Sequence, residues 1–292
     1  MKRRAFIKGS LLGALLPGAL ARASAHTVTA AAEPPARLGA LERLHGGRLG
    51  VAMLDTGSGR RIGHRADERF LMCSTFKVLA VAAVLARVDH GQERLERRIV
   101  FDRDVLLSYA PVTRLHSGAP GMRIDELCAA AITVSDNTAA NLLLASLGGP
   151  PAVTAFVRTL GDRITRLDRT EPQLNLTRPG DLRDTTTPDA MLESLRRLLL
   201  GDALSDASRA RLLGWMRGCL TGVDKLRAGL PAGWSAADKT GSGSQGESND
   251  VAIVFPPGRA PLLVTAYYAA PAADAGLRSA VLAEVGRIAS LV

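Results

Sequence analysis

The fold is decided by residues 48–64, which read RLGVAMLDTGSGRRIGH. Two runs that favour strands, 48–55 and 60–64, flank the small residues of segment 56–59. This arrangement is typical of a β-hairpin with a tight turn. The sequence therefore predicts two adjacent antiparallel strands near the N-terminus.

After this hairpin, the spacing between apolar residues along the chain changes. Residues 70–213 have the longer apolar period of helices. Strand patterns return late in the chain, before a closing helix at 276–291; they lie at 235–240, 251–255 and 262–268. Strands at both ends of the chain around a helical middle indicate one sheet built from N- and C-terminal pieces.

We predict an α/β (α+β) fold, in which an antiparallel sheet of about five strands is flanked by N- and C-terminal helices and carries an inserted, mostly helical domain. The expected boundaries are 26–66 and 217–292 for the discontinuous α/β domain, and 67–216 for the helical domain. Because clefts tend to lie at domain junctions, we expect the active site between them.

The composition excludes several classes of protein. With 292 residues, 47% of them hydrophobic and 22% charged, the chain is neither collagen-like, nor disordered, nor a disulfide scaffold. Three widely spaced cysteines, Cys73, Cys128 and Cys219, allow at most one disulfide and form no zinc motif. The five histidines are too far apart in the sequence to suggest a metal site, so we expect no metal. Segment 241–246 fits the dinucleotide-binding pattern G-x-G-x-x-G, but it leads into a strand and not into the helix that would hold a pyrophosphate. We therefore expect no other cofactor.

The formal charge of +9 does not indicate a nucleic-acid partner. Five of the basic residues lie in residues 1–25, where Arg3-Arg4-Ala5-Phe6-Ile7-Lys8 resembles a bacterial twin-arginine export signal. An apolar stretch too short for a membrane helix follows, and Ala23-Ser24-Ala25 offers a cleavage site. Cleavage leaves a formal charge of +4. We therefore predict a periplasmic protein with no stable membrane association, no nucleic-acid partner and a monomeric state.

Three short motifs occur in a fixed order along the chain. Ser74 and Lys77 form S-x-x-K at the start of an apolar helix, where both side chains lie on one helix face and can share a proton. Ser135-Asp136-Asn137 follows between two helical runs, and Lys239-Thr240-Gly241 ends a strand. Each alone has an ordinary alternative: a helix cap for Ser74, a turn for the second motif and an edge-strand lysine for the third.

Together, in this order, the motifs resemble those of the penicillin-recognising serine enzymes. A fourth segment, Arg169-Thr170-Glu171-Pro172-Gln173-Leu174-Asn175, resembles the omega loop of class A β-lactamases, here expected at 166–184 within the helical domain. The resemblance covers nearly all of residues 37–292. It implies hydrolysis of the β-lactam amide of penicillins and cephalosporins, and hence antibiotic resistance.

The resemblance also implies the catalytic roles. Ser74 is the nucleophile that forms an acyl-enzyme, and Lys77 helps to move its proton. Ser135 passes a proton to the leaving lactam nitrogen. Glu171 activates the water that hydrolyses the acyl-enzyme, and Asn175 positions that water. The sequence leaves open whether Lys77, or Glu171 acting through water, is the acylation base.

Binding and structural roles follow from the same resemblance. The backbone N–H groups of Ser74 and Ser242 are the expected oxyanion hole. Arg169 and Asp184 are expected to close the omega loop by an ion pair, and the Glu171–Pro172 bond to be cis. The expected substrate-binding residues are Tyr109, Asn137, Lys225, Lys239, Thr240, Gly241 and Ser242.

Two positions depart from common family patterns. Many members carry an arginine where this chain has Ser248, and Lys225 aligns with a site that supplies a substitute arginine in other members, although a loop lysine is usually just solvated. Many carbapenem-hydrolysing members have a disulfide where Cys73 here faces Gly243. That bridge cannot form in this chain, so the sequence does not support a carbapenemase.

Two alternatives share the three motifs. A cell-wall DD-peptidase deacylates β-lactams very slowly, and a β-lactam sensor stays acylated in order to signal. Glu171 and Asn175 favour the β-lactamase over both, because they supply the water that releases the acyl group.

Overall fold

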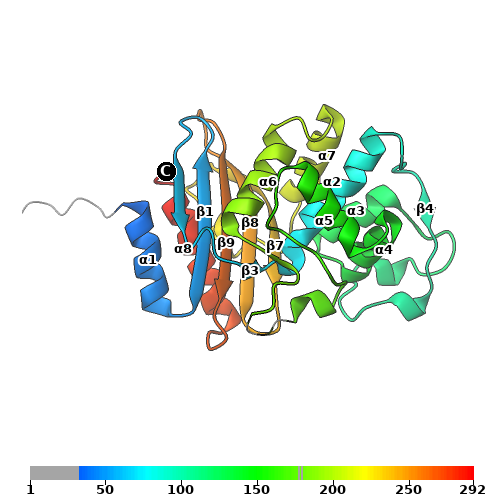
Figure 1. Ribbon diagram of the computed structural model, residues 1–292, viewed down its shortest axis with the longest axis horizontal. Coiled ribbons are helices and arrows are strands. Elements are labelled where there is room, and N and C mark those ends of the chain that lie inside the picture. The colour runs from blue at the N-terminus through cyan, green and yellow to red at the C-terminus, as the bar shows by residue number, and fades with distance from the viewer. Residues whose placement is uncertain (1–32, 177, 179) are drawn as a thin grey trace, which may run out of the picture. The chain divides into compact units, whose positions relative to one another are not determined.

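The computed structural model describes residues 33–176, 178 and 180–292 (Figure 1). The predicted leader at 1–25, its cleavage site and the first residues of the predicted α/β domain lie outside these ranges.

A five-stranded antiparallel sheet forms one part of the described chain. Its order is β2-β1-β9-β8-β7, so the N-terminal hairpin pairs with C-terminal strands, as predicted. The strands are β1 (Arg48–Asp55), β2 (Arg61–His64), β7 (Ser235–Ser242), β8 (Glu247–Phe255) and β9 (Leu262–Ala269). Helices α1 (Pro34–His45) and α8 (Ala275–Ala289) pack against each other on one face of the sheet (Figure 1).

Strand β1 is buried on both faces, because it lies inside the sheet between two hydrophobic clusters. Leu49, Val51 and Met53 pack towards α1 and α8. Ala52 and Leu54 belong to the cluster on the helical side. Gly50 shares the second face, and a Cβ there would lie 2.2 Å from a ring atom of Phe70. Glycine therefore allows the Phe70 ring to pack directly on the strand.

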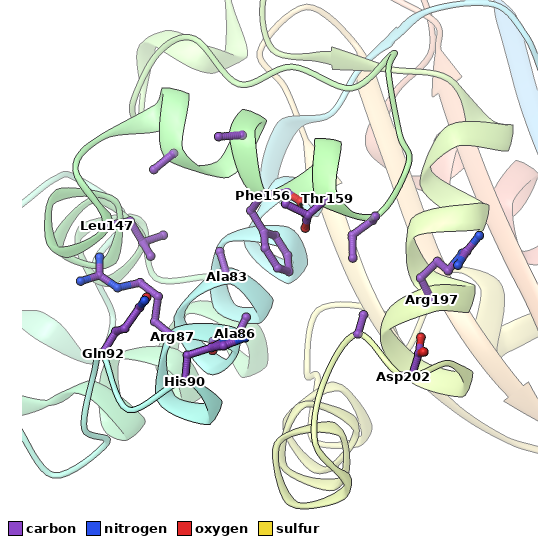
Figure 2. Close-up of a pocket in the computed structure, with 14 residues that line it drawn as sticks. Ala83, Ala86, Arg87, His90, Gln92, Leu147, Phe156, Thr159, Arg197 and Asp202 are labelled. Atoms are coloured by element: carbon purple, nitrogen blue, oxygen red, sulfur yellow. Dashed lines mark hydrogen bonds between the residues drawn. The ribbon is translucent and has the colours of Figure 1, made fainter.

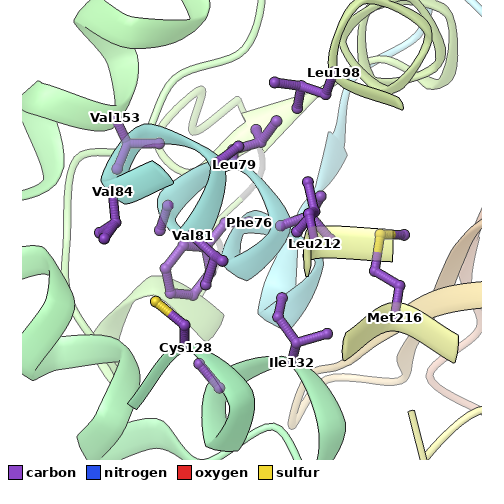
Figure 3. Close-up of a cluster of buried hydrophobic side chains, with 14 of the residues drawn as sticks. Phe76, Leu79, Val81, Val84, Cys128, Ile132, Val153, Leu198, Leu212 and Met216 are labelled. Carbon is purple, nitrogen blue, oxygen red and sulfur yellow. The ribbon is translucent and has the colours of Figure 1, made fainter. Parts of the chain in front are cut away.

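Helix α2 (Phe76–Asp89) is the centre of the helical part. Every residue from Phe76 to Leu85 is buried, which requires neighbours on all sides of the helix. These neighbours include Cys128, Val153, Leu198 and Met216 from four other helices (Figure 3). The surrounding helices are α3 (Ile124–Thr133), α4 (Asn137–Leu147), α5 (Pro150–Thr159), α6 (Pro188–Leu200) and α7 (Asp206–Arg217).

Short elements complete the described chain. Helix α6 contacts β1 and β9 on the sheet face opposite α8, and so links the helical part to the sheet. Two small antiparallel ribbons pair β3 (Phe70–Leu71) with β6 (Thr185–Thr186) and β4 (Arg98–Ile99) with β5 (Met122–Arg123). The 3-10 turns are η1 (Cys73–Thr75), η2 (Arg103–Val105), η3 (Thr113–Leu115), η4 (Gln173–Asn175) and η5 (Leu226–Gly229).

One strand begins earlier than the sequence pattern indicates. The apolar run predicts a strand from Val251, whereas β8 begins at Glu247. The four added residues are polar yet buried, so no apolar run marks them. Side-chain hydrogen bonds hold this segment in place. The Nδ2 group of Asn249, for example, donates to the carbonyl oxygens of Leu71 and Met72 at 2.9 and 3.1 Å.

Candidate active site

Residues from all three motifs line one cavity of about 390 Å³ between the helical part and β7. From the motifs come Ser74, Ser135, Asn137 and Thr240; the other lining residues are Tyr109, Asn175, Thr221, Lys225 and Ser242, which directly follows the third motif. Thr221 was not predicted. Its Oγ1 lies 2.5 Å from Oγ1 of Thr240.

A larger cavity, of about 600 Å³, lies between α2, α5 and α6 (Figure 2). Its walls include Ala83, Leu147, Phe156 and Arg197. It shares no lining residue with the cavity at Ser74 and contains none of the predicted catalytic residues. The chemistry of the side chains therefore identifies the smaller cavity as the candidate active site.

Ser74 lies in η1, immediately before α2. Its hydroxyl caps no helix and instead donates to Oε1 of Glu171 at 3.3 Å, so the interpretation of Ser74 as a simple cap is wrong. The preceding Cys73 has a φ of +46°, in the left-handed region that residues with a side chain rarely adopt. Such strained backbone is common at active sites, where the surrounding structure holds it in place.

Strand β7 lies directly against this turn. A Cβ on Gly241 would lie 2.8 Å from the carbonyl oxygen of Met72 and 3.2 Å from the backbone nitrogen of Ser74. Glycine therefore permits the backbone approach that an oxyanion hole between Ser74 and Ser242 requires.

Lys77 is fully buried and contacts residues from three segments. Its Nζ donates to the carbonyl oxygen of Ser135 at 2.8 Å and to Oδ1 of Asn137 at 2.7 Å, and lies 3.3 Å from Oε1 of Glu171. Burial lowers the pKa of Lys77 to about 8, although the negative charge of Glu171 opposes that shift. The lysine can therefore change charge close to physiological pH.

The Ser135-Asp136-Asn137 loop is held by its central residue. The Asp136 carboxylate accepts hydrogen bonds from the backbone N–H groups of Val112, Thr113 and Ala139, each at 2.9 Å. The last of these bonds caps α4, so Asp136 is the cap of this helix, and Ser135 and Asn137 are not. Ser135 has a φ of +60°. The loop is thus fixed in a strained conformation beside Lys77.

Lys239 lies at the opposite side of Ser135. It is fully buried, which lowers its pKa. Its Nζ donates to Oγ of Ser135 at 3.0 Å and to the carbonyl oxygen of Thr240 at 2.7 Å. Since Nζ of Lys77 lies 3.2 Å from the same hydroxyl oxygen, two ammonium groups converge on Ser135.

Glu171 is held by two asparagines. Its Oε2 accepts from Nδ2 of Asn175 at 2.6 Å. Asn141, which no motif indicates, bonds the glutamate backbone twice: its Nδ2 donates to the carbonyl oxygen and its Oδ1 accepts from the N–H, both at 2.9 Å. The signal for Asn141 is an amide side chain one helical turn after Asn137 in a mostly apolar helix.

The rest of the predicted omega loop is anchored by Asp184. The Oδ2 atom of this buried aspartate lies 2.5 Å from Nε of Arg169, and its Oδ1 accepts from the backbone N–H groups of Asp168 and Arg169. The Glu171–Pro172 peptide bond is cis.

The two remaining substrate-binding candidates lie at the rim of the cavity. Tyr109 is 49% exposed, and its hydroxyl donates to the carbonyl oxygen of Val134 at 3.1 Å. Lys225 is largely buried, and its Nζ donates to Oγ of Ser279 on α8 at 3.1 Å. No motif or spacing in the sequence indicates that serine.

The described residues contain no cluster of three or more potential metal ligands. No single helix among them is long and apolar enough to cross a membrane; α4 and α5 meet that test only as a pair bent by 71°. In the same ranges the three cysteines are free and buried, and a Cβ on Gly243 would lie 3.2 Å from Sγ of Cys73.

Comparison with known proteins gives the family. A model of the beta-lactamase enzyme family matches residues 35–291. The chain therefore belongs to the beta-lactamase enzyme family. Beta-lactamase L2 of Stenotrophomonas maltophilia is 50% identical over 288 residues, covering 98% of this chain and 94% of the relative. Beta-lactamase CTX-M-8 of Citrobacter amalonaticus is 49% identical over 86% of each chain.

Solved structures give the class. An ancestral class A beta-lactamase matches with a TM-score of 0.87 and 59% identity, over 89% of this chain and 99% of that one. A putative class A beta-lactamase from Rhodopseudomonas palustris matches with a TM-score of 0.86 and 54% identity, over 88% and 98%. Within its family this chain is a class A β-lactamase.

Proposed function

We propose that this β-lactamase hydrolyses the lactam amide of penicillins and cephalosporins through an acyl-enzyme on Ser74, and thereby confers antibiotic resistance. The observation that carries the proposal is the position of one carboxylate oxygen. Oε1 of Glu171 lies 3.3 Å from Oγ of Ser74 and 3.3 Å from Nζ of Lys77. The nucleophile Ser74 and the cation Lys77 thus both lie next to one buried oxygen of Glu171, which can act as an acid or base.

In the first step, Oγ of Ser74 attacks the lactam carbonyl carbon and loses its proton. Two groups can take that proton, Glu171 and Lys77, because Oε1 of Glu171 lies 3.3 Å from Oγ of Ser74 and 3.3 Å from Nζ of Lys77. The oxyanion lies between the backbone N–H groups of Ser74 and Ser242. Each such donor typically lowers the barrier by about 3 kcal/mol.

The leaving lactam nitrogen then takes a proton from Ser135. Its hydroxyl is suited to this transfer, because the ammonium groups of Lys77 and Lys239 lie 3.2 and 3.0 Å from Oγ. Either cation stabilises the negative charge that develops on the oxygen as its proton leaves. Breaking of the C–N bond completes the acyl-enzyme.

In the second step, Glu171 removes a proton from water as that water attacks the ester carbonyl carbon. The C–O bond to Ser74 then breaks, Oγ of Ser74 takes a proton as it leaves, and the hydrolysed product is released. Nδ2 of Asn175 fixes Oε2 of the glutamate at 2.6 Å, and Asn141 fixes its backbone. Rigid positioning of a general base in this way favours rapid turnover. This step separates a β-lactamase from a DD-peptidase or a sensor.

We assign substrate binding to the rim and the β7 side of the cavity. Asn137 and Tyr109 face the acyl side chain of the substrate. The substrate carboxylate lies near Thr240, Ser242 and Lys225, with Lys239 behind them. Gly241 allows β7 to approach the nucleophile.

We further propose the domain division given above, with the described parts 33–66 and 217–292 as the α/β domain, 67–216 as the helical domain and 166–184 as its omega loop. Residues 1–25 are assigned as a twin-arginine leader on their sequence, which implies export to the periplasm. No metal, other cofactor or nucleic acid is assigned to the protein, and it is assigned as a monomer.

The proposal is tested with the purified mature protein, Glu171→Ala and, as a control, Glu96→Ala, which removes an exposed glutamate. Each protein is mixed with a penicillin, and hydrolysis and intact mass are followed. We expect rapid turnover by the parent and the control, and a persistent acyl adduct on Ser74 in Glu171→Ala. A parent that acylates but turns over slowly would refute the deacylation mechanism.

A further inference from the structure

Lys225 is distinguished by its charge. Nine residues line the cavity at Ser74, all within the described part of the chain, and Lys225 alone among them is charged. Opposite Ser242, strand β8 presents the neutral Ser248. Lys239 is fully buried behind the wall, where its ammonium group already bonds Ser135 and Thr240. Charge recognition at the cavity surface therefore falls to Lys225.

A serine and an aspartate fix the position of this ammonium group. Nζ of Lys225 donates to Oγ of Ser279 at 3.1 Å, and the same hydroxyl donates to Oδ2 of Asp224 at 2.7 Å. A serine hydroxyl has one proton and two lone pairs, so this geometry uses its proton for the carboxylate and a lone pair for the ammonium. Oδ1 of Asp224 also lies 3.6 Å from Nζ of Lys225, which closes a three-residue cycle.

These contacts matter because of the nature of the side chain. A lysine side chain has a flexible four-carbon stem, so contacts at its ammonium group are needed to hold it in one position. Ser279 and Asp224, whose side chain is 60% exposed, supply those contacts.

We propose that Ser279 and Asp224 are positioning residues, which hold the ammonium group of Lys225 at the carboxylate end of the cavity and so set the preference of the enzyme for β-lactams that carry a carboxylate beside the lactam nitrogen. This inference rests on the proposed function. It adds two residues, one of them on the C-terminal helix, to the determinants of substrate choice.

The test compares steady-state kinetics on a penicillin and on its carboxylate methyl ester. For the penicillin, we expect Lys225→Ala to raise KM roughly 10- to 100-fold, the effect of losing a hydrogen bond to a charged group. Ser279→Ala and Asp224→Ala should raise KM about fivefold with kcat within about twofold, the pattern of a lost ground-state contact. Kinetics on the ester should be the same for these variants and the parent.

A double-mutant cycle separates positioning from a merely structural role. If Ser279 acts through Lys225, Ser279→Ala has no further effect on KM in a Lys225→Ala background. Ser279→Thr, which keeps the hydroxyl, should restore the KM of the parent. Ser290→Ala, directly after the last residue of the same helix, is the matched control and should behave as the parent.

The inference is overturned if Ser279→Ala and Asp224→Ala leave KM for the penicillin unchanged, if they affect acid and ester equally, or if the effect of Ser279→Ala persists without Lys225. Asp224→Ala changes an exposed side chain, so it remains informative should Ser279→Ala fail to fold. Failure of the proposed function gives a different result, because the parent would then fail to turn over either compound.

Discussion

Replacing Asp250 by asparagine tests how two buried acids coexist in the sheet. Asp238 on β7 pairs with Ala252 on β8, so its side chain lies on the same sheet face as that of Asp250, two residues away. Asp238 Oδ1 is bonded by Nε of Arg227, and Asp250 Oδ2 accepts from the backbone N–H of Leu226 at 3.2 Å. The other two oxygens, Asp238 Oδ2 and Asp250 Oδ1, are buried without a partner in the described chain.

A single proton between the two acids would satisfy both orphan oxygens. Burial and the charge of Asp238 raise the pKa of Asp250 well above the ordinary 3.8, and burial raises that of Asp238. Above pH 3.8 the native protein therefore keeps a proton that the unfolded chain releases. Consequently, the free energy of unfolding falls as pH rises, by up to about 1.4 kcal/mol per pH unit, until the raised pKa is passed.

The amide of Asp250→Asn supplies an N–H donor that does not titrate. We expect the variant to match the parent near pH 5 and to be more stable by about 1 to 3 kcal/mol at pH 8, the usual cost of a buried polar group without a partner. Urea unfolding followed by circular dichroism between pH 5 and 9 measures this difference. Asp102→Asn, which changes an exposed aspartate, is the control and should keep the slope of the parent.

Two results would refute the reasoning. One is a pH dependence in Asp250→Asn as steep as in the parent. The other is a loss of about 3 kcal/mol or more at every pH, which is the effect of removing a charged partner from a buried pair.

Three further predictions concern the active site. Asn141→Ala should slow deacylation at least tenfold while acylation stays within about threefold, because only the support of Glu171 is lost; single-turnover mass spectrometry measures both rates, and equal slowing would contradict this. Asp184→Asn should cost about 3 kcal/mol or more in urea unfolding, since it leaves the charge of Arg169 without its carboxylate partner; a loss under 1 kcal/mol would count against the ion pair. Because burial lowers the pKa of Lys77 to about 8, the acylation rate should change as pH rises through 8; in stopped-flow kinetics a rise indicates neutral Lys77 as the base, a fall indicates Glu171 assisted by charged Lys77, and a flat profile would contradict a role for the charge of Lys77 in acylation.

The sheet topology could be predicted because local patterns mark its strands. Residues 48–64 indicate a hairpin without any tertiary information, and β9 is an apolar run with strand residues throughout. The start of β8 could not be predicted, because Glu247 and Asp250 are polar residues that only buried hydrogen bonds make compatible with a strand.

The candidate site also contains residues that could be predicted from the sequence and residues that could not. Ser74 and Lys77 lie three residues apart where η1 leads into α2, so their spacing alone indicates proton transfer. The position of Lys225 beside the cavity followed from resemblance. Its partner Ser279 could not be found from the sequence, because a contact between a loop and a distant helix leaves no local pattern.

Strand β1 lies between β2, which follows it directly, and β9, which is among the last segments of the chain. The longer of its two pairings, eight residue pairs with β9 against four with β2, is therefore absent while a ribosome is still producing the middle of the protein. Pairing across such a sequence separation is slow compared with helix formation. The helical middle can form during translation, whereas the sheet closes only after the C-terminus emerges. Until then the exposed edge of β1 is open to pairing with other chains, which makes it the segment that a chaperone has most reason to cover.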